Sequence, residues 1–229
     1  MKIYAIGDLH LSFSSDKPMD IYGPEWANHT ERLQANWEHK ISDEDIALIV
    51  GDISWALKLN DAKIDLNWIH NLPGKKIMIR GNHDLWWSSI NKLNNLYDDM
   101  IFLQNTHFEV GNTAICGSRG WTDLNDPDFT ENDEKIYRRE LLRMEMSLSS
   151  AEQAGIKDII AAIHFPPAAS NNKSTPFTDL FEKYNVRQVV YGHLHGIDSY
   201  DKGITGNLNG IDYSLVSIDY LNCDPLEIR

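Results

Sequence analysis

Five short segments of this sequence place carboxylate, amide or imidazole groups directly after an apolar run. They are Asp8-Leu9-His10, Gly51-Asp52, Gly81-Asn82-His83-Asp84, His164, and His193-Leu194-His195. This mixed set of nitrogen and oxygen donors suits Mn, Fe, Zn, Co or Ni, and no cysteine lies among them to select a softer ion. Together the segments supply the ligands that a site for two metal ions needs.

The apolar runs before these segments predict buried strands. The runs cover residues 2–6, 45–50, 77–80, 159–163 and 186–191. In open α/β sheets, ligands bind outside the carboxyl ends of the strands, which is where the polar segments fall. Residues two apart in an extended segment point the same way, so Asp8 and His10 can converge on one ion. His193 and His195 have the same spacing.

Three of the five segments also have a structural alternative. Asp8 and His10 could form a polar turn, Asp52 could cap the next helix, and His164 could be a buried core histidine. Arg119 follows another predicted strand and is flanked by glycines. Its guanidinium could grip a phosphate in bidentate fashion, or it could form an ordinary ion pair. The coincidence of so many donors at strand ends favours one shared site.

The composition predicts one ordered domain spanning residues 1–229. Hydrophobic residues make up 42% of the chain, and no low-complexity tract or long linker interrupts it. The net charge of −13 disfavours a long nucleic acid as partner, because that affinity depends on clusters of Lys and Arg. Two divalent cations would reverse the field locally, so a small phosphate ester could still bind.

The sequence also predicts the cellular compartment of the protein. The first residues lack the apolar core and cleavage site of a signal peptide, and no stretch reaches the roughly 18 apolar residues of a membrane span. The two cysteines, Cys116 and Cys223, cannot form a disulfide framework. We therefore predict a cytoplasmic protein with no membrane partner.

Helical periodicity and turn residues complete the prediction of an α/β protein. Ile64, Trp68 and Ile69 should face the core, and Gly111-Asn112 should join two short strands into a hairpin. Loops are expected at 12–25 and 121–134, and they are the segments expected to determine the substrate. The expected helices are 26–40, 61–71, 86–96, 133–154 and 176–184, and the short strands are 101–103 and 113–116.

Taken in order, these motifs resemble the calcineurin-like metallophosphoesterase superfamily. Its pattern is Asp-x-His, Gly-Asp, Gly-Asn-His-Asp/Glu, His and Gly-His-x-His, and every ligand position is filled between Asp8 and His195. The resemblance implies two mixed β-sheets packed as a sandwich and flanked by helices, in four αββα layers.

The resemblance also implies a role for each residue. One metal would be held by Asp8, His10 and His195, the other by Asn82, His164 and His193, with Asp52 bridging the two. A hydroxide bridging the ions would attack phosphorus. His83 would stabilise the developing charge or protonate the leaving oxygen, and Asp84 would orient the His83 ring.

One departure from the superfamily bears on the substrate. In its Ser/Thr protein phosphatases the second motif continues as Gly-Asp-x-x-Asp-Arg-Gly, whereas residues 51–57 here are GDISWAL. The missing Asp and Arg disfavour phosphoproteins, and Arg119 is a candidate replacement for the arginine. We expect a hydrolase of small phosphomonoesters or phosphodiesters, including nucleotides. A nuclease-like phosphodiesterase and a non-catalytic binding scaffold are the alternatives, and the oligomeric state is not predicted.

Overall fold

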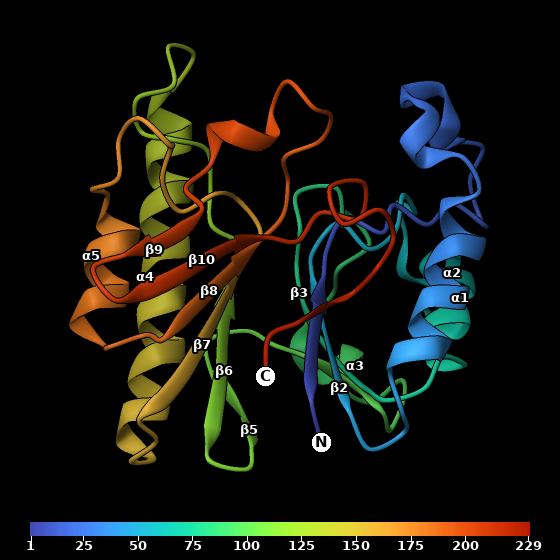
Figure 1. Cartoon of the computed structure of the whole chain (residues 1–229), viewed down its shortest axis with the longest axis horizontal. Helices are drawn as coiled ribbons and strands as arrows, with labels where there is room; N and C mark the ends of the chain where they lie inside the picture. Colours follow the sequence, from blue (N-terminus) through green and yellow to red (C-terminus); the bar gives the residue numbers. More distant parts are fainter. The chain divides into compact units, whose positions relative to one another are not determined.

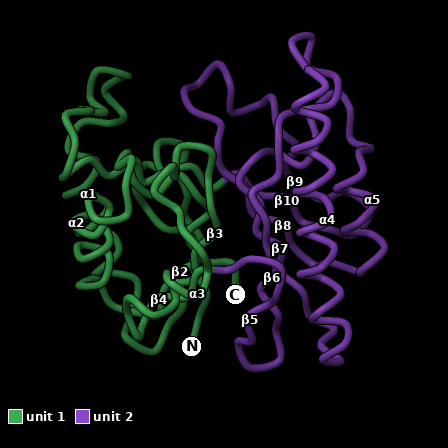
Figure 2. The backbone as a smooth tube through the Cα atoms, turned by 180° about the vertical axis from the view of Figure 1, so that it is seen from behind, with its two compact units in different colours: residues 1–102, 216–229 green, residues 103–215 purple.

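The computed structural model describes residues 1–229, which divide into two compact units. Unit 1 comprises residues 1–102 and 216–229, and unit 2 comprises residues 103–215 (Figure 2). Each unit has its own mixed sheet, flanking helices and buried apolar cluster, which confirms the predicted α/β class with two mixed sheets. No helix combines the length and the apolar character needed to cross a membrane.

The sheet of unit 1 has the strand order β11-β1-β2-β3-β4. Four strands are parallel and β11 is antiparallel to β1. Because the carboxyl ends of parallel strands meet at one edge, the segments that follow β1, β2 and β3 leave the sheet together. The strands are β1 (Ile3–Ile6), β2 (Ile46–Val50), β3 (Lys75–Ile79), β4 (Met100–Phe102) and β11 (Leu226–Glu227).

Both faces of this sheet are apolar and buried. Tyr4 and Ile49 pack in one cluster with Leu33, Trp37 and other residues of the helices, and α1 and α2 lie on the same side of the sheet (Figure 1). The alternate strand residues are buried as well, which explains why the strands are continuous apolar runs. The helices are α1 (His29–Lys40), α2 (Leu59–His70) and α3 (Ile90–Leu93), with short 3₁₀ turns η1 (Met19–Tyr22) and η2 (Pro24–Trp26) before α1.

Two predictions for the helices of unit 1 were wrong. The helix expected at 86–96 is only the single turn α3, because the indole of Trp86 bonds back to Asp84 and holds the preceding segment in a turn. In α2, Ile64 is 51% exposed, since the inner face is formed by Ala62, Leu66 and Ile69.

The sheet of unit 2 has the strand order β5-β6-β7-β8-β10-β9. Its inner strands are parallel, and β5 and β9 are antiparallel edge strands. The predicted turn at Gly111-Asn112 joins β5 to β6, but the expected arm at 101–103 overlaps β4, which pairs with β3 in unit 1. The strands are β5 (His107–Val110), β6 (Thr113–Ser118), β7 (Asp158–Ile163), β8 (Gln188–Tyr191), β9 (Gly206–Leu208) and β10 (Ile211–Leu215).

Two helices flank this sheet, α4 (Glu131–Gln153) and α5 (Pro176–Lys183), and both lie on the same side of it (Figures 1 and 2). Each begins with a reciprocal capping box, formed by Thr130 with Asp133 and by Thr175 with Thr178. Met144 of α4 is among the residues that pack onto the strands. The long helix thereby supports β6 along its length.

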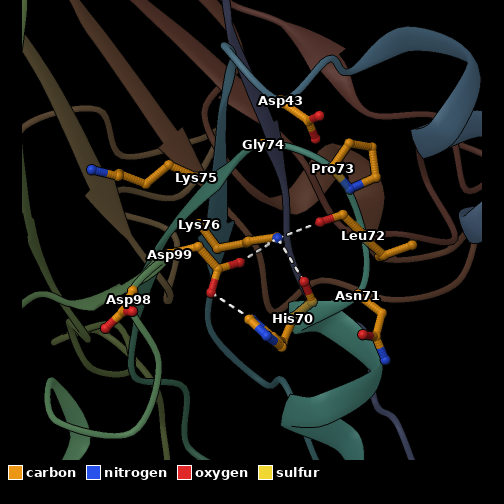
Figure 3. A pocket seen from close by; sticks show the side chains of 10 residues that line it. All are labelled: Asp43, His70, Asn71, Leu72, Pro73, Gly74, Lys75, Lys76, Asp98 and Asp99. Carbon is orange, nitrogen blue, oxygen red and sulfur yellow. Dashed lines mark hydrogen bonds and ion pairs between the residues drawn. The ribbon is translucent and has the colours of Figure 1, made fainter.

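A buried lysine lies at the end of the unit 1 sheet that is opposite the polar segments. Lys76 is 1% exposed, and its ammonium donates to the carbonyl oxygens of His70, at 3.2 Å, and Leu72, and to Asp99 Oδ2, at 2.6 Å (Figure 3). Burial opposes ionisation of Asp99, but its bonds to Lys76 and His70 outweigh burial and hold its pKa below the usual value. The charge of Lys76 therefore complements the carboxyl end of α2.

Replacing Lys76 by methionine should destabilise the protein by about 2 to 4 kcal/mol, because two carbonyls and a carboxylate lose their donor. The control is Lys75→Met, whose exposed side chain points away from this cluster (Figure 3). Its free energy of unfolding should change by no more than about 0.5 kcal/mol. Urea denaturation measures both values, and equal losses would contradict the role given to Lys76.

Candidate metal centre

The segments that leave β1 and β2 are bonded side by side along their backbones. Asp8 N donates to Gly51 O at 2.9 Å, and His10 N donates to Asp52 O at 3.0 Å. These bonds continue the parallel pairing of the two strands beyond the sheet. They fix Asp8, His10 and Asp52 next to one another.

Three of these residues adopt left-handed backbone conformations. The φ angles are 60° at Asp8, 45° at His10 and 48° at Asp52. Such angles are uncommon outside glycine, although Asp and His tolerate them better than most residues. Strained backbone of this kind clusters at functional sites, where the surrounding structure holds it.

The side chains of these three residues are buried close together. Asp8, His10 and Asp52 are 0%, 2% and 1% exposed. Asp8 offers a ligand atom within 4.8 Å of one on His10 and of one on Asp52, and His10 Nε2 lies 3.8 Å from Asp52 Oδ2. Buried carboxylates are stable when paired or bound to metal, so this donor set fits a divalent cation.

Gly81 allows the loop after β3 to approach this group. A Cβ atom at Gly81 would lie 2.1 Å from Asp52 Oδ1 and 2.2 Å from Asp52 N, so no other residue fits there without displacing Asp52. Two residues later, His83 N donates to Asp52 Oδ1 at 2.8 Å. The carboxylate of Asp52 is therefore oriented by the neighbouring loop, and its Oδ2 atom faces His10.

The ring of His83 is accessible, unlike the buried side chains around it. Its side chain is 44% exposed, and Nε2 lies 4.0 Å from Asp52 Oδ2. The ring contacts Trp55, with 4.4 Å between ring centroids. Asn82, the residue before it, is partly buried. The ring of His83 is thus open to solvent on part of its surface.

The carboxylate of Asp84 is bonded to backbone amides and to an indole. It accepts hydrogen bonds from Gly81 N at 2.8 Å, Ile53 N at 2.9 Å, Trp86 Nε1 at 3.0 Å and Ser54 N at 3.2 Å. Burial, with a further contribution from the nearby Asp52, raises the pKa of Asp84 to about 6. Asp84 joins the loops after β2 and β3 through their backbone amides.

Two residues of this region were not predicted from the sequence. Trp55 stacks on the ring of His10 at 4.7 Å, and Asp65 of α2 is fully buried. Asp65 accepts hydrogen bonds from Phe13 N, at 3.0 Å, and from the hydroxyl of Ser54. An acid on the apolar face of α2 was the available signal for Asp65, whereas the contact of Trp55 depends on the tertiary structure.

In unit 2, histidines follow β7 and β8. His164 is fully buried, its N atom donates to Arg119 O at 3.0 Å, and its O atom accepts from Gly192 N at 3.1 Å. His193 has a left-handed φ of 72°, and its ring centroid lies 5.2 Å from that of His164. His195, two residues on, is partly buried. The structure therefore brings His164 and His193 together.

The side chain of Arg119 forms an ion pair within unit 2. Its Nη2 atom lies 3.4 Å from Oε1 of the buried Glu140 on α4, and its guanidinium lies over the ring of Trp121 at 4.4 Å. This is the structural alternative that the sequence left open. The backbone carbonyl of Arg119 meanwhile fixes His164, so the residue supports the site through its main chain.

A family model described as calcineurin-like phosphoesterase matches residues 1–196 of this chain. The chain therefore belongs to the calcineurin-like phosphoesterase family, whose members act on phosphate esters. A curated relative, the Gene 66 protein of Mycobacterium phage D29, is 34% identical over 84 residues. That match spans 36% of this chain and about 40% of the relative's length.

Solved structures show the same fold at low sequence identity. The phosphopantetheinyl hydrolase of Mycobacterium tuberculosis superposes with a TM-score of 0.62 at 14% identity, covering 99% of this chain and 95% of that one. A protein of unknown function from Aquifex aeolicus gives 0.53 at 19% identity over 99% and 95%. The protein TT1561 of Thermus thermophilus gives 0.57 at 12% identity over 84% and 81%.

Replacing Asp84 by alanine should cost about 2 to 4 kcal/mol of stability in protein treated with a chelator, because four donors lose a buried acceptor. The matched control is Asp98→Ala, an exposed acid of the same unit, which should change stability by no more than about 0.5 kcal/mol. Chemical denaturation followed by circular dichroism gives both values. If the two variants were equally stable, Asp84 would not join the loops as described.

Proposed function

We propose that this protein is a metal-dependent hydrolase of small phosphomonoesters or phosphodiesters, including nucleotides. The observation that carries the proposal is the family match to residue 196, because it includes every residue of the expected ligand set, the last being His195. The buried donor group of unit 1 and the histidine pair of unit 2 support it.

The proposed ligands are those that the resemblance to the family implies. Two divalent ions, with Mn²⁺ as the first choice for assay, would supply Lewis acidity and lower the pKa of water at the reacting phosphorus. The bridging position suits Asp52, whose carboxylate is buried and oriented by His83 N. The proposed ligands are Asp8, His10 and His195 for one ion, Asn82, His164 and His193 for the other, and Asp52 for both.

His83 is proposed to act on the substrate directly. Imidazole exchanges protons near neutral pH, so it can donate one to the leaving oxygen or stabilise charge on the phosphoryl group. The 44% exposure of its side chain lets a substrate reach it, and Trp55 supports one side of the ring. Asp84 contributes by fixing the backbone on either side of His83.

The two alternative functions make different predictions for the same assay. A nuclease-like phosphodiesterase is disfavoured by the net charge of −13. With Mn²⁺, we expect hydrolysis of p-nitrophenyl phosphate, of bis-p-nitrophenyl phosphate, or of both. Turnover of the diester alone would favour a phosphodiesterase. No turnover, with metal shown to be bound, would favour a binding scaffold and refute the proposal.

Replacing Asp52 by asparagine should abolish turnover and lower the metal content measured by mass spectrometry. Asparagine also tolerates a left-handed φ, so the change removes the charge with little backbone strain. Asp43→Asn, which alters an exposed acid of unit 1, is the control and should keep both properties. A variant at position 52 with near-normal turnover would refute the bridging role.

Replacing His83 by alanine should slow turnover by about 10² to 10⁴ while leaving the metal content unchanged, because the side chain is proposed to act on the substrate rather than on the ions. His39→Ala, at an exposed histidine of α1, is the matched control and should behave as the unaltered protein. Loss of metal from the His83 variant equal to that from Asp52→Asn would show that His83 is itself a ligand.

A further inference from the structure

Unit 2 contains a hollow of about 270 Å³ beside one of the proposed metal ligands. Its lining includes Trp121, Phe165, Leu194 and His193. The hollow is slightly smaller than the pockets of about 300 to 1,000 Å³ that take drug-sized ligands. It can therefore take a group of about the size of a small ring system.

Trp121 forms a rigid wall of this hollow. Its Nε1 atom donates to Asp133 Oδ1 at 2.9 Å, and Asp133 is itself fixed in the capping box of α4. The guanidinium of Arg119 lies over the indole, and the ring of Phe165 lies 5.2 Å away from it. An aromatic ring fixed in this way loses little conformational entropy when a flat apolar group packs against it.

The hollow is also lined by His193, a proposed metal ligand of unit 2. Phe165 follows His164 directly, and its ring centroid lies 4.0 Å from that of His193. If a phosphoryl group binds near His164 and His193, the group esterified to it can therefore reach the hollow.

The charges that line the hollow restrict what it accepts. Asp123 and Asp126 contribute two carboxylates, and Lys202 contributes one ammonium. Their sum is one negative charge, so a further anionic group on the ligand would be repelled. An uncharged or cationic group would not be repelled by these residues.

Building on the proposed function, we propose that this hollow binds the leaving group of the phosphate ester. The leaving group is an uncharged or cationic alcohol with a flat apolar face, and Trp121 is the residue that determines the preference. A leaving group that carries additional phosphate or carboxylate is excluded.

Kinetics on two esters test the preference. Trp121→Ala should lower kcat/KM for 1-naphthyl phosphate about tenfold and change kcat/KM for glycerol 2-phosphate less than about twofold, because only the naphthyl group fills the hollow. Leu142→Ala, at an exposed residue of α4, is the control and should change neither value. The double variant Asp123→Asn, Asp126→Asn should improve turnover of a sulfonated 1-naphthyl phosphate relative to 1-naphthyl phosphate.

Binding to chelator-treated protein separates this inference from the proposed function. 1-Naphthol should bind the unaltered protein in saturation-transfer NMR, and Trp121→Ala should weaken that binding. Ala169→Phe should weaken it too, because Ala169 also lines the hollow and the added ring would occupy part of it. This second variant tests the site even if Trp121→Ala does not fold.

The results have distinct meanings. If no ester is hydrolysed but naphthol binding depends on Trp121 and Ala169, the proposed function fails and the binding site stands. If esters are hydrolysed and neither variant alters naphthol binding or the preference for 1-naphthyl phosphate, the inference is overturned while the proposed function stands.

Discussion

The backbone bonding between the segments that leave β1 and β2 is the constraint on which the rest of the candidate site depends. The backbone amides of Asp8 and His10 donate to carbonyls of the segment after β2. Asp8, His10 and Asp52 hold left-handed conformations, which cost free energy for residues other than glycine. The buried core of unit 1, with Trp37 and Leu66 packed onto the sheet, supplies the stability that sustains this strain. The result is a fixed group of carboxylate and imidazole donors at one edge of the sheet.

Three further residues hold this group of donors in position. Gly81 leaves room for Asp52, Asp84 bonds to amides on both neighbouring loops, and Asp65 holds Ser54 from α2. None of these three is a proposed ligand. Their shared effect is to fix the candidate donor atoms in place, which would lower the cost of binding an ion. In unit 2, the carbonyl of Arg119 does the same for His164.

The sequence predicted the parts of the fold that local pattern determines. The buried strands were found because both of their faces are apolar, and the candidate ligands were found because each follows such a strand. Helix 86–96 failed because the indole of Trp86 bonds to Asp84, and Asp84 is itself held by the distant backbone amides of Ile53 and Ser54. The sequence left an ion pair of Arg119 open but could not identify Glu140 as its partner, and it could not predict the stacking of Trp55 on His10, since these partners are distant in the sequence.

The proposed function depends most on Asp52, the buried carboxylate at the edge of the unit 1 sheet, binding two ions at once. A crystal structure of the protein with Mn²⁺, using anomalous scattering at the manganese edge, tests it most directly. Two peaks about 3.5 to 4 Å apart, both bound by the carboxylate of Asp52, are the expected result. A single peak, or two peaks that do not share Asp52, would contradict the bridging role.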